Sequence, residues 1–262
     1  MASDCKIYSQ KDFEGLRAAG ALAAHILDYI TDFVQAGIST AELDTLCNEE
    51  MKRHGGISAC VGYNGYPAAT CISLNHVVCH GIPSARKLKN GDILNIDVTV
   101  ILDGWYGDTS RMYKVGKIAP KASELIDGAY NAMMMAIDLV RPGAHLGDIG
   151  AIIQEYAESL KFSVVRDYCG HGIGRVFHDD PAVLHYGKAG TGMELRPGNV
   201  FTIEPMINVG KYQTRVMGDG WTAITADHSL SAQFEHTIGV TEDGHEIFTK
   251  SPMGFTKPPY RK

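Results

Sequence analysis

The 262-residue sequence lacks the long apolar runs that mark a secretion signal or a membrane span. No stretch of about 18 consecutive apolar residues occurs, and the opening residues MASDCKIYSQKDFEGLR are charged throughout. Positive charge is not in excess either, since the net charge is −6. We therefore expect a cytoplasmic chain with no membrane partner and no DNA partner, because a basic surface is what holds nucleic acid.

Cysteine is present but lacks the arrangement of a thiolate zinc site. Six cysteines occur, and no two of them form a Cys-x-x-Cys pair. Without a secretion signal, free thiols are the expected state. Hydrophobic residues make up 45% of the chain, which is enough to build a packed core.

The chain repeats itself at an interval of about 107 residues. The segment LKNGDILNID at 88–97 resembles LRPGNVFTIE at 195–204, and FVQAGISTAELDTL at 33–46 resembles LVRPGAHLGDIGAI at 139–152. Two pairs of similar segments at nearly the same offset indicate a duplicated domain. A solenoid is not indicated, because its repeats are far shorter than this interval.

Each half has two amphipathic helical patterns followed by strand patterns. Asp12 is a plausible cap for the first helix, and Ser39 or Thr40 for the second. This order predicts an α+β fold with antiparallel sheet. The expected helices span 12–34, 38–54, 123–140 and 145–160, and the expected strands span 57–61, 70–74, 93–101, 105–115, 200–208, 220–225 and 233–241.

An unusual pair of acids lies in the expected hairpin at 93–115. Asp103-Gly104 is a strong two-residue turn signal. With that turn, Asp97 faces Ser110, Thr99 faces Asp108, and the two aspartates share one face of the sheet. A register shifted by one residue would separate them. The alternative is a pair of ordinary solvent-facing acids, which is common on antiparallel sheets.

Two further acids and a histidine extend this set of candidate ligands. Glu204 is the counterpart of Asp97 in the repeat, Glu235 lies in another apolar strand pattern, and His171 stands between glycines. Each acid taken singly would more often be structural. Four carboxylates and an imidazole together form an oxygen-rich ligand set that suits two divalent ions.

Several segments together resemble the type I, bacterial-style methionine aminopeptidases. They are GYNGYPAATCISLNHVVCHGIP, NIDVTVILDGWYGDTSR, YCGHGIGRVFH, FTIEPM and SLSAQFEHTI. The resemblance implies the pita-bread fold, with two pseudo-symmetric halves (about 12–115 and 121–248), a central antiparallel sheet and outer helices. It implies one catalytic domain over 1–250, a loose tail at 251–262, and a dinuclear site. The implied ligands are Asp97, Asp108, His171, Glu204 and Glu235, with Asp108 and Glu235 bridging the ions.

The resemblance also implies removal of N-terminal methionine before a small second residue by a metal-activated water. Glu204 would carry the proton, while His80 and His178 would contact the substrate. The implied apolar pocket for the methionine side chain consists of Cys60, Tyr63, Tyr66, Cys71, Phe177 and Trp221. A monovalent cation is implied, more weakly, near Asn75, Val77 and Ser231.

Several alternatives stay open at this point. Prolidase and aminopeptidase P share the implied fold, a type II enzyme would carry a long insertion after the histidine loop, and related binding modules have lost the ligands. Only 25 residues separate His178 from Glu204, which favours type I. We expect a monomer that acts on nascent polypeptide N-termini, with ribosome contact implied by relatives. The metal, whether Fe(II), Mn(II) or Co(II), is not decided by this ligand set.

Overall fold

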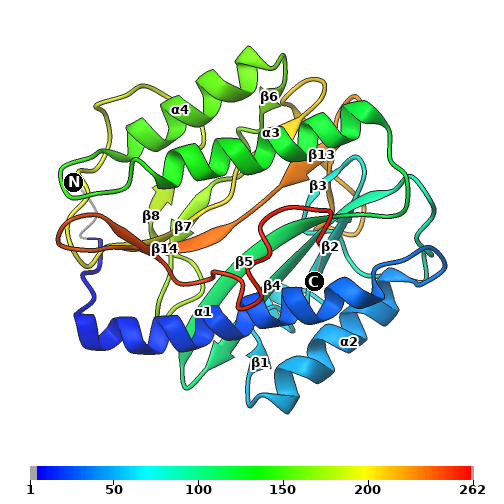
Figure 1. Ribbon diagram of the computed structural model, residues 1–262, viewed down its shortest axis with the longest axis horizontal. Helices are drawn as coiled ribbons and strands as arrows, with labels where there is room; N and C mark the ends of the chain where they lie inside the picture. The colour runs from blue at the N-terminus through cyan, green and yellow to red at the C-terminus, as the bar shows by residue number, and fades with distance from the viewer. Residues whose placement is uncertain (1–4, 261–262) are drawn as a thin grey trace.

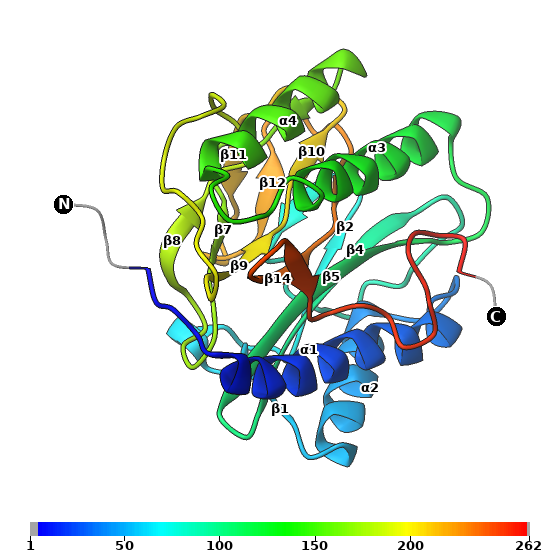
Figure 2. The same ribbon diagram turned by 60° about the vertical axis from the view of Figure 1, so that its left-hand side comes forward.

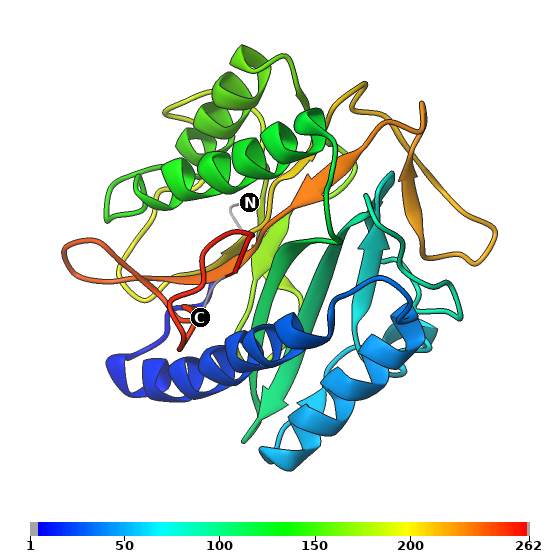
Figure 3. The same cartoon turned by 45° about the vertical axis from the view of Figure 1, so that its right-hand side comes forward.

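Four helices in two pairs pack on the same side of the strands (Figure 1). The computed structural model describes residues 5–260. Figures 1 and 3 show one pair in blue beside the other in green, with the strands behind them. None of the helices described is both long and apolar enough to cross a membrane. The helices are α1 (Gln10–Ile30), α2 (Thr40–Arg53), α3 (Pro120–Ile137) and α4 (Leu146–Ser159).

The strands of the described residues form antiparallel pairs throughout. The first half contributes β1 (Ile57–Ser58), β2 (Cys71–Leu74), β3 (Val77–Cys79), β4 (Ile93–Leu102) and β5 (Trp105–Lys114). The second contributes β6 (Ser163–Val164), β7 (Gly170–Gly172), β8 (Asp179–Val183), β9 (Val200–Ile203), β10 (Met206–Asn208), β11 (Thr214–Val216), β12 (Ala223–Thr225), β13 (Ser231–Gln233), β14 (His236–Val240) and β15 (His245–Ile247). The predicted α+β fold with paired helices in each half is confirmed.

The helix starts follow from their capping residues. Ser39 caps α2, as predicted, and exchanges hydrogen bonds with Glu42. The cap predicted for α1 is wrong, because Ser9 is the cap. The Ser9 hydroxyl accepts a hydrogen bond from the Asp12 N–H, and the Asp12 carboxylate accepts one from the Ser9 N–H. Asp12 was mistaken for the cap because both members of a capping box are polar.

Each pair of helices buries its apolar face against strands of its own half. Side chains of α1 and α2 form one core with β2, β4 and β5, and those of α3 and α4 form another with β9, β10, β13 and β14. Within the first core, Arg111 of β5 pairs with Asp28 of α1, and both side chains are about 2% exposed. The pair fixes α1 over the hairpin, since losing one partner would leave a buried charge uncompensated.

Two predicted strands are each interrupted at a glutamate. The strand expected at 200–208 breaks between β9 and β10, where Pro205 has no N–H to donate to a ladder. The strand expected at 233–241 breaks between β13 and β14, and Glu235 forms only an isolated bridge to Ser110. At each break, a glutamate carboxylate lies where the chain passes from one sheet to another.

The C-terminal segment is not the loose tail that was predicted. Ser251 donates to Asp28 of α1, Lys257 pairs with Asp127 of α3, and the Tyr260 hydroxyl donates to the Met112 carbonyl. Figure 2 shows this red segment running beside α1 and across the β4–β5 hairpin. Its prolines and basic residues predict irregular backbone. A segment without helix or strand can still pack against the rest of the chain through its side chains. Residues 261 and 262 of the expected tail, like residues 1–4, lie outside the described part of the chain.

Candidate metal centre and active site

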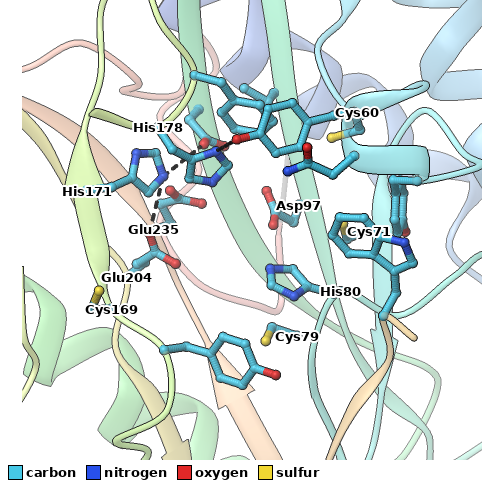
Figure 4. A pocket seen from close by; sticks show the side chains of 18 of the residues that line it. Cys60, Cys71, Cys79, His80, Asp97, Cys169, His171, His178, Glu204 and Glu235 are labelled. Carbon is cyan, nitrogen blue, oxygen red and sulfur yellow. Dashed lines mark hydrogen bonds and ion pairs between the residues drawn. The ribbon is translucent and has the colours of Figure 1, made fainter. Parts of the chain in front are cut away.

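One cavity of about 400 Å³ brings together the predicted site residues. Its lining includes all five predicted ligands, both predicted substrate-contacting histidines and all six residues of the predicted apolar pocket. In Figure 4, Asp97, His171, Glu204 and Glu235 converge on one region, and Cys60 and Cys71 lie on its Asp97 side. Residues from both halves of the repeat therefore face a common space.

The β4–β5 hairpin carries Asp97 and Asp108 in the predicted register. Asp97 pairs with Ser110, and Thr99 pairs with Asp108, so the two acids lie on one face. The Thr99 hydroxyl donates to Asp108 Oδ1 at 2.8 Å, which leaves Oδ2 directed to His171. Asp97 Oδ1 is buried with no hydrogen-bond partner. A buried carboxylate oxygen without a partner is costly unless a cation binds it.

The second half supplies His171, which lies between two acids. Its Nε2 lies 3.6 Å from Asp108 Oδ2 and 3.7 Å from Glu204 Oε1. The opposite ring nitrogen, Nδ1, lies 3.0 Å from the Gly172 carbonyl oxygen. With Nδ1–H donating to that carbonyl, Nε2 presents its lone pair to the carboxylates, as a metal ligand does.

Glu204 and Glu235 complete the group from the two strand breaks. Thr202 donates to Glu204 Oε1 at 2.8 Å, and Gln233 donates to Oε2 at 3.2 Å. The Glu235 N–H donates to the Ser110 carbonyl and links the two halves. Ligand atoms of Asp108, His171 and Glu235 all lie within 4.8 Å of one another.

The acids of this group have little positive charge beside them, and the pKa values of three of them are raised. Burial, followed by the neighbouring Asp108, raises the pKa of Asp97 and of Glu235 well above their usual values. Burial also raises the pKa of Glu204 to about 7. Although burial opposes it, hydrogen bonding to Asp108 and the charge of Glu204 raise the pKa of His171. One imidazole cannot neutralise four acids in a largely buried space, so the residues fit a site for divalent cations.

The raised pKa of Glu204 makes a contribution to the stability of the metal-free chain that is lost as the pH rises. In the folded chain Glu204 keeps its proton to about pH 7, whereas its ordinary pKa is 4.5. Between these values the folded state binds more protons than the unfolded state. The contribution of Glu204 to the free energy of unfolding therefore falls by about 1.4 kcal/mol per pH unit in this range.

Urea unfolding of the unaltered chain and of Glu204→Gln in chelator, from pH 5 to pH 7, isolates this fall. Histidines such as His178, whose pKa is lowered to about 4, affect both chains equally and cancel in the comparison. The unfolding free energy of the unaltered chain minus that of Glu204→Gln should decrease across this range. A difference that stays level or increases would contradict the expectation.

Two histidines lie at the rim of the group. His178 Nδ1 lies 2.9 Å from the Tyr63 hydroxyl, and burial lowers the pKa of His178 to about 4, so its imidazole is neutral at pH 7. His80 contacts Tyr168 and Trp221 edge-on, and burial lowers its pKa too. Both side chains are therefore available as neutral hydrogen-bonding groups.

The predicted apolar pocket forms a small core of its own. Cys60, Tyr66, Cys71 and Phe177 are buried together, with Tyr63 and Trp221 packed against them. The Tyr66 hydroxyl is satisfied by the Thr70 and Gly81 carbonyls, so the ring presents only apolar surface to its neighbours. Such a pocket suits a soft, weakly polar thioether.

Sequence reasoning missed the residues that hold the acids in place. Thr202 accepts from the His171 N–H and donates to Glu204, and it carried no separate signal in its strand pattern. His185 is fully buried and accepts the Glu204 N–H at 3.1 Å. Thr99 could have been found, because the predicted register already set it opposite Asp108.

Comparisons with known proteins show the family to which the chain belongs. A model of metallopeptidase family M24 matches residues 14–242. A methionine aminopeptidase of Rickettsia prowazekii is 60% identical over 256 residues, which cover 97% of this chain and 99% of that protein. A crystal structure of methionine aminopeptidase from Rickettsia prowazekii is similar with a TM-score of 0.93 at 61% identity, over 94% of this chain and 99% of that one.

A more distant similarity extends to the fold alone. Prolidase from Pyrococcus furiosus has a TM-score of 0.75 at 22% identity, over 93% of this chain and 65% of that one. The fold of this chain is thus also found in a protein that is only distantly similar to it in sequence.

Proposed function

This chain belongs to metallopeptidase family M24, as a methionine aminopeptidase, and from this we propose that five of its side chains hold two divalent ions beside the scissile bond. The enzyme removes N-terminal methionine by metal-dependent hydrolysis. The proposed ligands are Asp97, Asp108, His171, Glu204 and Glu235, with Asp108 and Glu235 shared between the ions. The observation that carries this proposal is the convergence of four carboxylates, two of them buried and two half-buried, and one imidazole on a single cavity.

The ligand chemistry narrows the choice of metal without fixing it. Oxygen predominates, with one imidazole nitrogen, which suits Fe(II), Mn(II) and Co(II). Bound ions of this kind acidify water and polarise a carbonyl group. A binding module without metal is disfavoured, because its remaining acids would repel one another in this buried space.

We propose separate roles for Glu204 and the histidines. Glu204 takes a proton from the attacking water and passes it to the leaving amine, a task that suits a carboxylate facing the same cavity as the proposed ions. If the Tyr63 hydroxyl donates to Nδ1 of His178, Nε2 carries a hydrogen that stabilises the developing oxyanion. His80 contacts the substrate on the leaving side.

The apolar pocket would hold the methionine side chain. Cys60, Tyr63, Tyr66, Cys71, Phe177 and Trp221 would surround it. A monovalent cation near Asn75, Val77 and Ser231 would stabilise the adjacent loops. Support for it comes from Ser231, whose hydroxyl oxygen is buried without a partner and whose N–H donates to the Asn75 carbonyl. The chain would act as a monomer on nascent polypeptides and, in that role, near the ribosome.

Paired peptides test the proposed specificity. We expect metal-loaded protein to release methionine from Met-Ala-Ser at least about 100-fold faster than from Met-Lys-Ser, because misplacing the reacting groups by about 1 Å costs that much. Free methionine, measured by chromatography under anaerobic conditions, gives both rates. Equal rates would remove the preference for a small second residue. Release from neither peptide with any metal would remove the enzymatic role.

A further inference from the structure

A second cluster of metal-ligating side chains lies between α1 and α2, outside the cavity. His25 belongs to α1, Glu50 to α2, and His54 caps the end of α2. Among the described residues this is one of two groups whose ligand atoms all lie within 4.8 Å of one another. None of its three members lines the cavity of the candidate active site.

The two imidazoles approach the same carboxylate oxygen. His25 Nε2 lies 2.9 Å from Glu50 Oε1, and His54 Nε2 lies 3.0 Å from that atom. Their rings meet edge-on with centroids 4.6 Å apart. Arg53 holds the other oxygen, Oε2, and so leaves Oε1 to the two histidines.

These distances are close to those of a small metal site. Tetrahedral zinc with bonds of about 2.0–2.1 Å separates its ligand atoms by about 3.3 Å. Each imidazole nitrogen therefore needs to move away from Glu50 Oε1 by only about 0.3–0.4 Å, which is within the reach of side-chain rotation.

The carboxylate of this cluster is buried, whereas its two imidazoles are partly exposed to solvent. The Glu50 side chain is 5% exposed, whereas those of His25 and His54 are 38% and 45% exposed. The carboxylate is thus held in the helix interface, and the two partly exposed imidazoles are accessible to an ion and to water from solvent. Burial raises the pKa of Glu50, but hydrogen bonds from both histidines outweigh it and the net shift is downward, so Glu50 is an anion at neutral pH.

We propose that His25, Glu50 and His54 form a separate divalent metal site, of the zinc class, that clamps α1 to α2. Two imidazoles and one carboxylate favour zinc, copper or nickel over the harder ions suited to the oxygen-rich cavity. Because α1 packs on the β4–β5 hairpin, an ion here would stabilise the support of Asp97 and Asp108 without touching substrate.

Zinc content measures this site directly. The unaltered chain, His25→Asn, His54→Asn and His228→Asn would be stripped with chelator, saturated with Zn²⁺ and freed of excess metal by gel filtration. His228 is the matched control: it lies beside His76 with no carboxylate in the pair, and asparagine tolerates its left-handed backbone (φ 59). We expect one equivalent less zinc in His25→Asn and His54→Asn than in the other two chains. Equal zinc in all four would overturn the proposal.

Two further measurements separate this site from the catalytic one. Hydrolysis of Met-Ala-Ser by manganese-loaded His54→Asn should match that of the unaltered chain, and zinc should raise the melting temperature of the unaltered chain by several degrees more than that of the variant. Crystals of the unaltered chain in Zn²⁺ should give an anomalous peak bonded to His25, Glu50 and His54. The absence of a peak at these residues would overturn the proposal, and this result does not depend on whether the variants fold.

Discussion

Replacing Asp108 by asparagine should lower methionine release by about 1000-fold or more while leaving the chain folded. The amide removes a charge shared by both proposed ions, and metal polarisation contributes several kcal/mol to such reactions, at about 1.4 kcal/mol per factor of ten. Folding should persist, because Asn keeps the shape of Asp and one fewer buried acid reduces repulsion within the group. Release from Met-Ala-Ser and circular dichroism measure the two effects.

Asp103→Asn is the matched control for this variant. Asp103 lies at the turn of the same hairpin with φ 51, a conformation that Asn adopts readily, and Asn-Gly is a favoured turn pair. The control should keep near-normal activity. If Asp108→Asn also kept near-normal activity, its role as a ligand would be withdrawn.

Removing metal with chelator should reduce activity to below about 1% of its starting value, and single ions should restore it. The pKa values of His178 and His80 are lowered, so without metal neither of these two histidines supplies the strong positive charge that polarises a carbonyl. Fe(II), Mn(II) and Co(II), each added alone under anaerobic conditions, would be compared by the initial rate with Met-Ala-Ser. Chelator already saturated with calcium controls for effects other than metal removal. Undiminished hydrolysis after complete removal of metal would exclude a metal-dependent step.

The hairpin shows how far local sequence determines a site. The turn at Asp103-Gly104 fixes the register of β4 and β5, and alternation then sets Asp97 and Asp108 on one face. Capping, turn chemistry and the period of apolar residues are all local signals. The hairpin and the four helices were therefore predictable, with boundaries shifted by a few residues.

The contacts between the halves were not predictable from these local patterns. Glu204 and Glu235 were assigned to continuous strands, but both lie where strands end, because the chain passes there from one sheet to another. Thr202, Gln233 and His185 hold Glu204 through contacts that no spacing in the sequence reveals. The predicted set of acids thus came from the repeat and the family resemblance, whereas their hydrogen-bonding partners required the structure.

Anomalous diffraction from crystals of the unaltered chain in Mn²⁺ is the most direct measurement of the proposed dinuclear centre. We predict two peaks inside the cavity, each bonded to side chains of the set Asp97, Asp108, His171, Glu204 and Glu235. Clear density for these five side chains with no manganese peak among them would contradict the account.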